Sequence, residues 1–189
     1  MKPVRERLMD ATFEEVYQNG YQGASLANIL ARADVKKGSM YHYFSSKEEM
    51  VLAVIDERIK VRSTLLWEKL RQTNKAIIPT LLEILKNTQT RDFTRGCPIG
   101  NLLQDAPALQ ISIHEAITAH IKIWKEWFKE ALDKAVALGE IRCENTLALS
   151  TFLIAAIEGA ILLAKQGGEE TEYLTCIDHL ESYLNSLSS

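Results

Sequence analysis

Apolar residues recur every three or four positions along most of this 189-residue chain, and that spacing is the period of an amphipathic helix. The first such run follows Pro3, where Val4, Leu8 and Val16 lie on one predicted face. Gly20 predicts the end of this helix, because glycine tolerates the backbone conformation that closes a helix. No segment alternates as a strand does, and the chain has 4 prolines and 9 glycines. The pattern therefore predicts an all-α protein.

Capping and turn residues divide the rest of the chain into further helices. Ser25 stands before the segment LANILARA, where its side chain can accept a hydrogen bond from the first turn. Ser45 or Ser46 can cap the fourth helix, and Glu48 and Glu49 suit its first turn. Beyond the first helix we expect helices at 26–34, 37–43, 46–71, 77–90, 98–105, 109–138, 145–166 and 171–187, which makes about nine in all.

The second and third predicted helices are separated by a short turn, which is the outline of a helix-turn-helix. Asp34 stands in that turn, and aspartate tolerates the left-handed backbone that the turn needs. Lys36 and Lys37 place positive charge at the start of the third helix, and Met40 and Phe44 are expected in the core. A glycine that allows close backbone approach, and groups that can bond phosphates or base edges, complete this segment: Gly38, Ser39, Tyr41, His42 and Tyr43.

Positive charge is concentrated in the segment that contains these two helices. Residues 24–47 hold four basic residues and one acid, so their local charge is +3, whereas the whole chain carries −3. Residues 61–189 hold 13 basic and 16 acidic residues. We therefore expect nucleic-acid contact from the first segment and not from the rest of the chain.

Composition excludes several classes of protein. With 47% hydrophobic and 25% charged residues, the chain is neither collagen-like, disordered nor a disulfide scaffold. Its three cysteines form no CxxC pair, which favours a reducing cytoplasm. No apolar run approaches the ~18–20 residues of a membrane span, and the first ten residues contain no apolar stretch typical of a signal peptide. We expect a cytoplasmic protein with no membrane partner.

The sequence lacks the common signatures of catalytic and metal sites. It has no GxSxG, P-loop, GxGxxG or HExxH motif. His114 and His120 share a predicted helix, but their spacing of six residues places them poorly for one metal ion. We therefore expect no enzyme activity, no metal site and no cofactor.

A family resemblance lies in the stretch A-S-L-A-N-I-L-A-R-A-D-V-K-K-G-S-M-Y-H-Y-F-S-S-K-E-E-M. It closely resembles the N-terminal domain of the tetracycline-repressor (TetR) family of transcriptional regulators, and the likeness covers residues 5–55. Two positions depart from the family pattern: Asp34 replaces the usual glycine of the turn, and Glu15 stands where an apolar residue is common. By this resemblance Ser25 caps the second helix and touches a phosphate, and Lys47 holds the DNA backbone. The full set of implied DNA-binding residues is Ser25, Lys36, Lys37, Gly38, Ser39, Tyr41, His42, Tyr43 and Lys47.

The resemblance also implies how the chain is organised. Residues 1–47 would form the helix-turn-helix DNA-binding domain, and residues 48–189 the ligand-binding and dimerisation domain. A homodimer would bind a palindromic double-stranded DNA operator, because two-fold sites match two-fold proteins. A small molecule, electrophile or oxidant acting on the C-terminal domain would then release this repressor from DNA. The alternative is a helical interaction protein without sequence-specific DNA binding.

The last two predicted helices are candidates for the dimer interface. The segment TLALSTFLIAAIEGAILLAK, residues 146–165, is apolar nearly all round, so it must be buried in a core or an interface. The last helix adds further apolar residues: Tyr173, Leu174, Ile177, Leu180, Leu184 and Leu187. In the family the corresponding helices form a four-helix dimer interface. The alternative is a helix buried within one chain.

The effector site is less clearly marked than the DNA-binding segment. In the family a small molecule enters the C-terminal domain and changes the spacing of the two DNA-binding heads. Aromatic residues on the predicted helices are candidates to line its pocket, although each could equally be an ordinary core residue: Trp67, Trp124, Trp127, Phe128 and Phe152.

The segment RDFTRGCPIGNLLQD singles out Cys97. Pro98 suits the first position of a helix, so Cys97 would be the N-cap, and a helix N-terminus with Arg95 nearby lowers the pKa of a thiol. The stretch resembles the subgroup that includes the N-ethylmaleimide-reductase repressor, in which a cysteine here senses electrophiles and oxidants near a lysine that corresponds to Lys165. Its Gly-Cys-x-x-Gly-Asn-Leu pattern, which includes Asn101, resembles a second, ligand-responsive subgroup. Cys97 is therefore either a reactive sensor or a packed residue beside a conventional ligand pocket.

Overall fold

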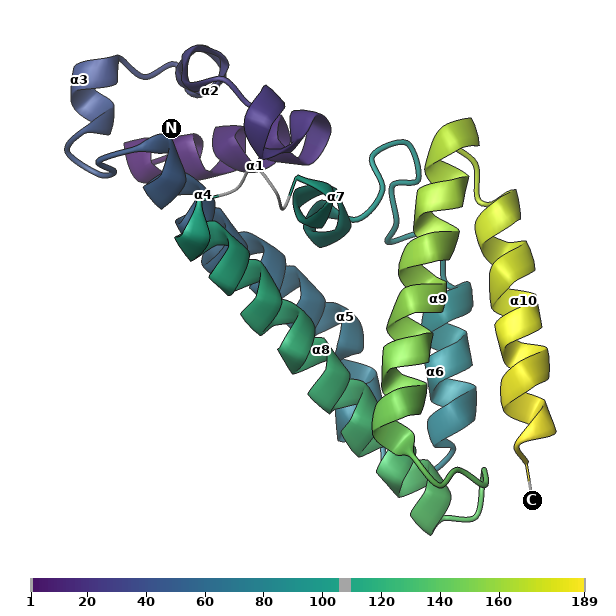
Figure 1. Cartoon of the computed structure of the whole chain (residues 1–189). Coiled ribbons are helices and arrows are strands. Elements are labelled where there is room, and N and C mark those ends of the chain that lie inside the picture. Colours follow the sequence, from purple (N-terminus) through teal and green to yellow (C-terminus); the bar gives the residue numbers. More distant parts are fainter. Residues whose placement is uncertain (1, 106–109, 189) are drawn as a thin grey trace. The chain divides into compact units, whose positions relative to one another are not determined.

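The computed structural model describes residues 2–105 and 110–188, and helices are the regular elements found there (Figure 1). The elements α4 (Lys47–Val54), η1 (Ile55–Ile59, a π-helical segment) and α5 (Lys60–Gln72) form one continuous helix. The other elements are α1 (Val4–Gly23), α2 (Leu26–Ala33), α3 (Lys37–Met40), α6 (Ile77–Lys86), α7 (Pro98–Gln104), α8 (Ile111–Ala137), α9 (Thr146–Gly167) and α10 (Thr171–Ser186). Among the described residues this makes nine helices, so the all-α prediction is confirmed.

The chain forms two compact units, which we describe separately. The first unit consists of residues 1–62 and 97–120, and the second of residues 63–96 and 121–189. The predicted boundary after residue 47 divides the chain by function and stays a prediction. The predicted start of the seventh helix at residue 109 lies outside the described residues.

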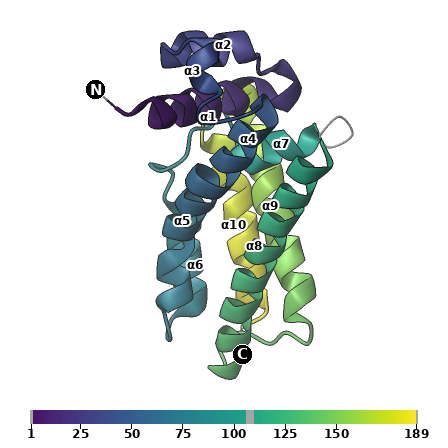
Figure 2. The same ribbon diagram turned by 90° about the vertical axis from the view of Figure 1, so that its left-hand side faces the viewer.

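In the first unit α1 packs against α2, α4 and α7 (Figure 2). Completely buried apolar side chains form the core between these helices, among them Leu8, Ile29 and Met50. Met40 is also completely buried, and Phe44 is 3% exposed, so the prediction that both are core residues is confirmed. These two side chains attach α3 and the turn after it to the rest of the unit.

The turns of the helix-turn-helix have the predicted conformations. The Ser25 hydroxyl oxygen accepts a hydrogen bond from the Asn28 N–H at 3.0 Å, which confirms its role as the N-cap of α2. Asp34 has φ 52° and ψ 53°, the left-handed conformation that the turn requires. α3 ends three residues earlier than predicted, because the two amides after its C-cap residue donate to carbonyls three residues back and tighten the backbone.

Two other predicted helix ends differ from the structure by more than one residue. α1 continues to Gly23, but Gly20 inside it has φ 67° and ψ −177°, so the predicted break at Gly20 is present. α6 ends four residues earlier than predicted, because Asn87 takes an extended conformation with φ −78° and ψ 97°. The sequence thus locates the helices better than it locates their ends.

Ser46, rather than Ser45, is the N-cap of α4. Its hydroxyl oxygen accepts a hydrogen bond from the Glu49 N–H at 3.1 Å. The Glu49 carboxylate accepts hydrogen bonds from the backbone N–H and the hydroxyl of Ser45, at 2.6 and 2.7 Å, and these bonds lower its pKa. The reciprocal bonds fix the start of α4.

In the second unit α10 packs against α9 and α6 (Figures 1 and 2). Tyr173 of α10 is completely buried, its hydroxyl donates to the Leu85 carbonyl at 2.9 Å, and burial raises its pKa to about 12. Glu140, in the loop after α8, accepts hydrogen bonds from the N–H groups of Ile77 and Ile78, both at 2.9 Å. This carboxylate satisfies two amides that have no partner within the first turn of α6.

Among the described residues one helix, α9, is long and apolar enough to cross a membrane. Its most apolar 18-residue window has a mean hydropathy of 2.2, and 39% of that window is buried inside the structure. The expectation that no apolar run approaches such a length is therefore wrong for this segment. Length and composition alone do not identify a span, because the core helix of a water-soluble protein passes the same test. The low burial does show that this chain covers less than half of the window.

Candidate nucleic-acid interface and effector residues

α3 and the turn after it form a band of exposed polar and aromatic groups. Tyr41 is 54% exposed and Tyr43 is 45% exposed, whereas Met40 and Phe44, which flank them in the sequence, are buried in the core. The exposed members of the band are Lys36, Lys37, Gly38, Ser39, Tyr41, His42 and Tyr43. The structure therefore brings together seven of the nine predicted DNA-binding residues on one continuous stretch of surface.

Gly38 is not required by the packing of this chain. A Cβ atom added to it would meet no atom within 4 Å, and its φ is not positive. Alanine would therefore fit at this position without strain in the isolated protein. A partner whose surface approaches the α3 backbone closely is what would favour glycine here.

Lys47 is engaged within the protein by part of its ammonium group. Its Nζ donates to the carbonyl oxygens of Tyr21 and Ala24, at 2.8 and 2.9 Å, and lies 4.2 Å from the centre of the Tyr21 ring. Burial lowers the pKa of Lys47. An ammonium group has three N–H donors, so a phosphate contact would use the third.

Two acidic residues with structural roles were missed as such by the sequence analysis. Glu15 is 3% exposed; its carboxylate accepts a hydrogen bond from Asn28 Nδ2 at 2.9 Å and lies 3.9 Å from Arg32 Nη2. The departure from an apolar residue at Glu15 was a signal of this buried pairing. Asp105 accepts a hydrogen bond from the Tyr21 N–H at 2.7 Å, and nothing in the local sequence marked it.

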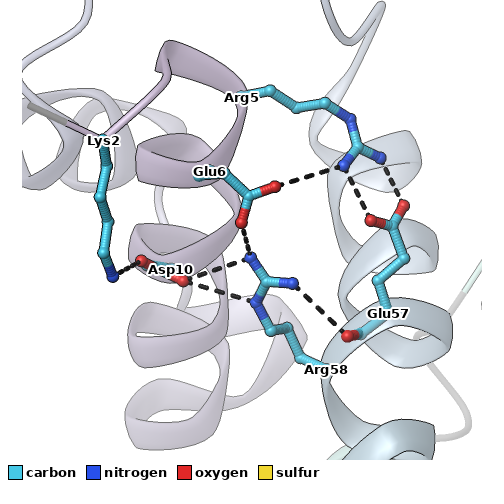
Figure 3. A network of polar contacts seen from close by, with 6 residues as sticks. All are labelled: Lys2, Arg5, Glu6, Asp10, Glu57 and Arg58. Atoms are coloured by element: carbon cyan, nitrogen blue, oxygen red, sulfur yellow. Dashed lines mark hydrogen bonds and ion pairs between the residues drawn. The ribbon is translucent and has the colours of Figure 1, made fainter.

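A network of ion pairs joins the first turns of α1 to η1 (Figure 3). Its members are Lys2, Arg5, Glu6, Asp10, Glu57 and Arg58. The guanidinium of Arg5 donates to both carboxylate oxygens of Glu57, and this hydrogen bonding raises the pKa of Arg5 and lowers the pKa of Glu57. Arg58 pairs with two acids of α1. The network holds α1 against η1, although each partly exposed pair adds little stability by itself.

α7 begins as predicted, with Cys97 as N-cap and Pro98 as its first residue. Cys97 is half-buried, and its side chain makes no capping hydrogen bond. Asn101, the other predicted sensor residue in α7, donates from Nδ2 to the Tyr17 carbonyl at 3.0 Å. The structure thus places Asn101 against α1, within the unit that contains the helix-turn-helix.

Four predicted pocket-lining aromatics lie in the second unit on α5 and α8. Trp67 and Phe128 are 4% and 3% exposed, and their ring centroids are 4.8 Å apart in an edge-to-face arrangement. Trp124 is also buried. Trp127 is half-buried, and the Arg71 guanidinium lies 4.7 Å from the centre of its ring.

The two predicted effector residues of α9 differ from these aromatics in exposure. Phe152 is 48% exposed and packs against Tyr183 of α10, with 5.3 Å between ring centroids. Lys165 is half-buried in the last turn of α9. The structure therefore places Phe152 on an outer face of the helix pair.

Two hollows lie on the second unit, with volumes of about 730 and 670 Å³. The first is lined by residues of the segments 88–93 and 168–171. The second is lined by residues of α6 and of the C-terminal part of the chain, with Glu140 between them. No predicted effector residue lines either of these two hollows, so neither supports the predicted pocket.

Comparison with known families gives two matches that together cover much of the chain. Residues 8–54 match the family described as "Bacterial regulatory proteins, tetR family". Residues 76–180 match the family described as "Tetracyclin repressor-like, C-terminal domain". The first match contains α2, α3 and α4, and the second contains α6 to α9.

Similar curated proteins are regulators. The chain is 30% identical to the transcriptional regulator AcuR of Cereibacter sphaeroides over 85% of this chain and 75% of that protein. It is 28% identical to an uncharacterised HTH-type transcriptional regulator of Lactococcus lactis, over 87% and 85% of the two chains. It is also 28% identical to the HTH-type transcriptional repressor DhaR of a Mycobacterium species, over 86% and 83%.

Solved structures of regulators share the fold. The regulatory protein TetR from Rhodobacter sphaeroides superposes with a TM-score of 0.84 at 27% identity, over 94% of this chain and 97% of that one. The reduced form of Escherichia coli NemR superposes with a TM-score of 0.84 at 23% identity, over 95% of each chain. The second likeness concerns the fold alone.

Proposed function

Since this chain belongs to the tetracycline-repressor family, we propose that it binds a palindromic operator as a homodimer and leaves the DNA when an effector acts on it. The chain is a DNA-binding transcriptional regulator of the helix-turn-helix type and is not an enzyme. The proposal that this regulation is repression rather than activation rests on the likeness to the repressor DhaR. Because bacterial DNA lies in the cytoplasm, the proposed function places the protein there.

The exposed band of α3 is the observation that carries the DNA-binding part of the proposal. Lys37 stands in the first turn of α3, from which a recognition helix reaches base edges in the major groove. Gly38 allows the helix backbone to approach the DNA, and the exposed Tyr41 hydroxyl can donate to a phosphate oxygen. Further phosphate or base contacts are proposed for Ser25, Lys36, Ser39, His42, Tyr43 and Lys47.

Binding-site selection tests this part of the proposal. The full chain is used to select duplexes from a random-sequence library, and affinities for a selected and an unselected duplex are then measured by fluorescence anisotropy. Lys37→Ala should weaken binding to the selected duplex about 5- to 150-fold, since a good base contact contributes about 1–3 kcal/mol, and should affect the unselected duplex less. Tyr41→Phe should weaken both duplexes in the same proportion.

The matched control is Lys69→Ala, because Lys69 is an exposed lysine of the second unit, paired with Glu83. It should leave both affinities within about twofold of the wild-type values. If the wild-type chain selects no sequence, the chain does not read DNA sequence as proposed. That result would favour the alternative, a helical protein without sequence-specific DNA binding.

The proposed dimer interface is the outer face of α9 and α10. Large apolar residues are about half exposed there: Leu147, Phe152, Leu162, Leu163 and Tyr183. With 39% of its most apolar window buried in one chain, α9 leaves a patch of a kind that marks a protein–protein contact. A second copy of the same face would cover it with the two-fold symmetry that a palindromic site requires.

Sedimentation equilibrium tests the dimer. Phe152→Glu places a charge in the proposed interface and should raise the dimer dissociation constant by at least about 100-fold, since burying an unpaired charge costs several kcal/mol. Leu65→Glu is the matched control, because Leu65 is an apolar residue of α5 that is 66% exposed. Equal self-association of the two variants and the wild type would place the interface elsewhere.

Cys97 is the proposed site of effector action. It occupies the N-cap position of α7 and is partly accessible, so a reagent can reach its thiol. Addition of the thiolate across the double bond of N-ethylmaleimide forms a carbon–sulfur bond, and a proton from water completes the adduct. We expect this reaction to release the selected duplex in the wild type and not in Cys97→Ser.

Two cysteine controls complete this experiment. Cys143→Ser and Cys176→Ser should respond to the reagent as the wild type does, and mass spectrometry should locate the adduct on Cys97. If Cys97→Ser is released as readily as the wild type, the effector acts non-covalently. The aromatic residues Trp67, Trp124, Trp127 and Phe128 would then be the first positions to test.

A further inference from the structure

The end of α1 has an interrupted ladder of backbone hydrogen bonds. In an uninterrupted helix the Tyr21 N–H donates to the Tyr17 carbonyl, four residues earlier. Here Gly20 takes φ 67° and ψ −177°, and both groups bind side chains of the α7 segment. The Tyr21 N–H donates to Asp105 Oδ2 at 2.7 Å, and the Tyr17 carbonyl accepts from Asn101 Nδ2 at 3.0 Å. Asp105 and Asn101, which are four residues apart, thus replace the backbone acceptor and the backbone donor of one hydrogen bond of α1.

Tyr21 is held by side chains from two different helices. Besides the bond from its N–H to Asp105, its carbonyl accepts from Lys47 Nζ at 2.8 Å, and its ring lies under the same ammonium at 4.2 Å. Lys47 also binds the Ala24 carbonyl at 2.9 Å. Tyr21 is 7% exposed and Ala24 is 1% exposed. The segment from Gly20 to Ala24 is therefore fixed by α7 on one side and α4 on the other.

The contact between Gly20 and Asp105 depends on the absence of a side chain. A Cβ atom on Gly20 would lie 2.4 Å from Asp105 Oδ2, which is closer than two such atoms can approach. The positive φ of Gly20 also disfavours any other residue. The carboxylate is thus seated directly against the backbone of α1.

We infer that α7 positions the DNA-reading helices, with Asn101 and Asp105 holding the broken end of α1 in the place from which α2 and α3 meet DNA. Ser25, the N-cap of α2, follows Tyr21 by four residues, so displacement of this segment moves the start of α2. Neither side chain needs to touch DNA, and both act as positioning residues. Because Cys97 directly precedes α7 as its N-cap residue, the same two contacts connect a change at Cys97 with the helix-turn-helix. The inference rests on the proposed DNA-binding function.

The test compares Asp105→Ala with the control Asp56→Ala, since Asp56 is an exposed acid of the same unit. The probe is a duplex that the wild-type full chain has selected from a random-sequence library. Asp105→Ala should weaken binding to this duplex about tenfold, whereas Asp56→Ala should stay within about twofold. The affinity for an unselected duplex should stay within about twofold of the wild-type value for both variants, because nonspecific phosphate contacts tolerate a displaced helix-turn-helix. Asp105→Asn keeps an acceptor oxygen and should recover most of the lost affinity.

A role in stability alone gives a different pattern. Asp105→Ala would then lower the unfolding midpoint and leave the ratio of the two affinities at its wild-type value, which would overturn the inference. If Asp105→Ala does not fold, Asn101→Ala is measured in its place, and an unchanged affinity ratio in that variant has the same meaning. If the wild-type chain itself selects no sequence, the proposed function fails; if it does and the variants match it, the inference alone fails.

Discussion

Gly20→Ala should lower the free energy of unfolding by about 2–6 kcal/mol. Gly20 has φ 67° and ψ −177°, a conformation that costs a residue with a side chain about 1–3 kcal/mol. The new Cβ would lie 2.4 Å from Asp105 Oδ2, so the carboxylate must move away. The buried Tyr21 N–H then loses its acceptor, which adds about 1–3 kcal/mol.

Urea unfolding followed by far-ultraviolet circular dichroism measures this loss, at one protein concentration for all variants. Gly38→Ala is the matched control, because its Cβ would meet no atom within 4 Å and its φ is not positive. It should change the free energy of unfolding by less than about 1 kcal/mol, in the stabilising direction. The two variants should also differ in their affinity for DNA, since Gly38 lies on the proposed recognition surface.

The Asp105→Ala background separates the two contributions at Gly20. Without the carboxylate there is no clash, so Gly20→Ala should then cost only the backbone part, about 1–3 kcal/mol. The reasoning is refuted if Gly20→Ala costs less than about 1 kcal/mol. It is equally refuted if the cost is the same with and without the Asp105 carboxylate.

Two further predictions concern charge. His120 is 2% exposed, and burial, followed by the nearby Lys60, lowers its pKa to about 4, whereas an unfolded histidine titrates near 6.5. The unfolded chain therefore takes up a proton first, and the free energy of unfolding should fall by about 2 kcal/mol between pH 7 and pH 5. Urea titrations of His120→Gln should lack this fall, and an unchanged pH dependence in that variant would assign it to other groups. Glu57→Gln should lower the free energy of unfolding by at most about 1 kcal/mol at low salt and by less at high salt. Because Arg5 lowers the pKa of Glu57, the wild type should keep that contribution above pH 4.5 and lose it as the pH falls further. If the loss of unfolding free energy in Glu57→Gln were the same at low and high salt, that result would contradict the ion pair.

Features that depend on neighbouring residues could be predicted from the sequence. Ser25 as an N-cap, Asp34 in a left-handed turn and Pro98 at the start of α7 each follow from the chemistry of one residue beside a helix. Met40 and Phe44 as buried anchors follow from the helical period. The exposure of Tyr41, His42 and Tyr43 was predictable for the same reason, since the positions between these two anchors must face outward.

Features that join distant parts of the chain could not be predicted in this way. Asp105 binds the amide of Tyr21, 84 residues away, and Glu140 caps the start of α6 from 63 residues away. A carboxylate in a loop gives no sign of which amide it will meet. The exposure of Phe152 could not be predicted either, because an apolar residue on an apolar helix is equally compatible with a core and with an interface.

The π-helical segment η1 did have a signal in the sequence. Residues that the structure buries follow one another at strict steps of four: Val51, Ile55, Ile59, Ser63 and Trp67. An α-helix has 3.6 residues per turn, so such a repeat drifts around the helix by about 40° at each step. A wider turn reduces the drift and keeps these side chains on the buried side. The presence of apolar positions predicts only a helix, whereas their strict repeat of four residues indicates the wider turn.

The extra residue in this wide turn has a consequence for sequence alignment and chain length. A π-helical turn holds one more residue than an α-helical turn would, so removing one residue between Ile55 and Ile59 should close the helix to regular α geometry. Because the wide turn accommodates that residue with little change in the total rotation of the helix, the side chains of α5 should keep their directions after the deletion. A relative that is one residue shorter here should therefore keep its apolar positions in α5 once a single gap is placed within this turn. The length of this turn can thus change by one residue without a change in the sequence of α5.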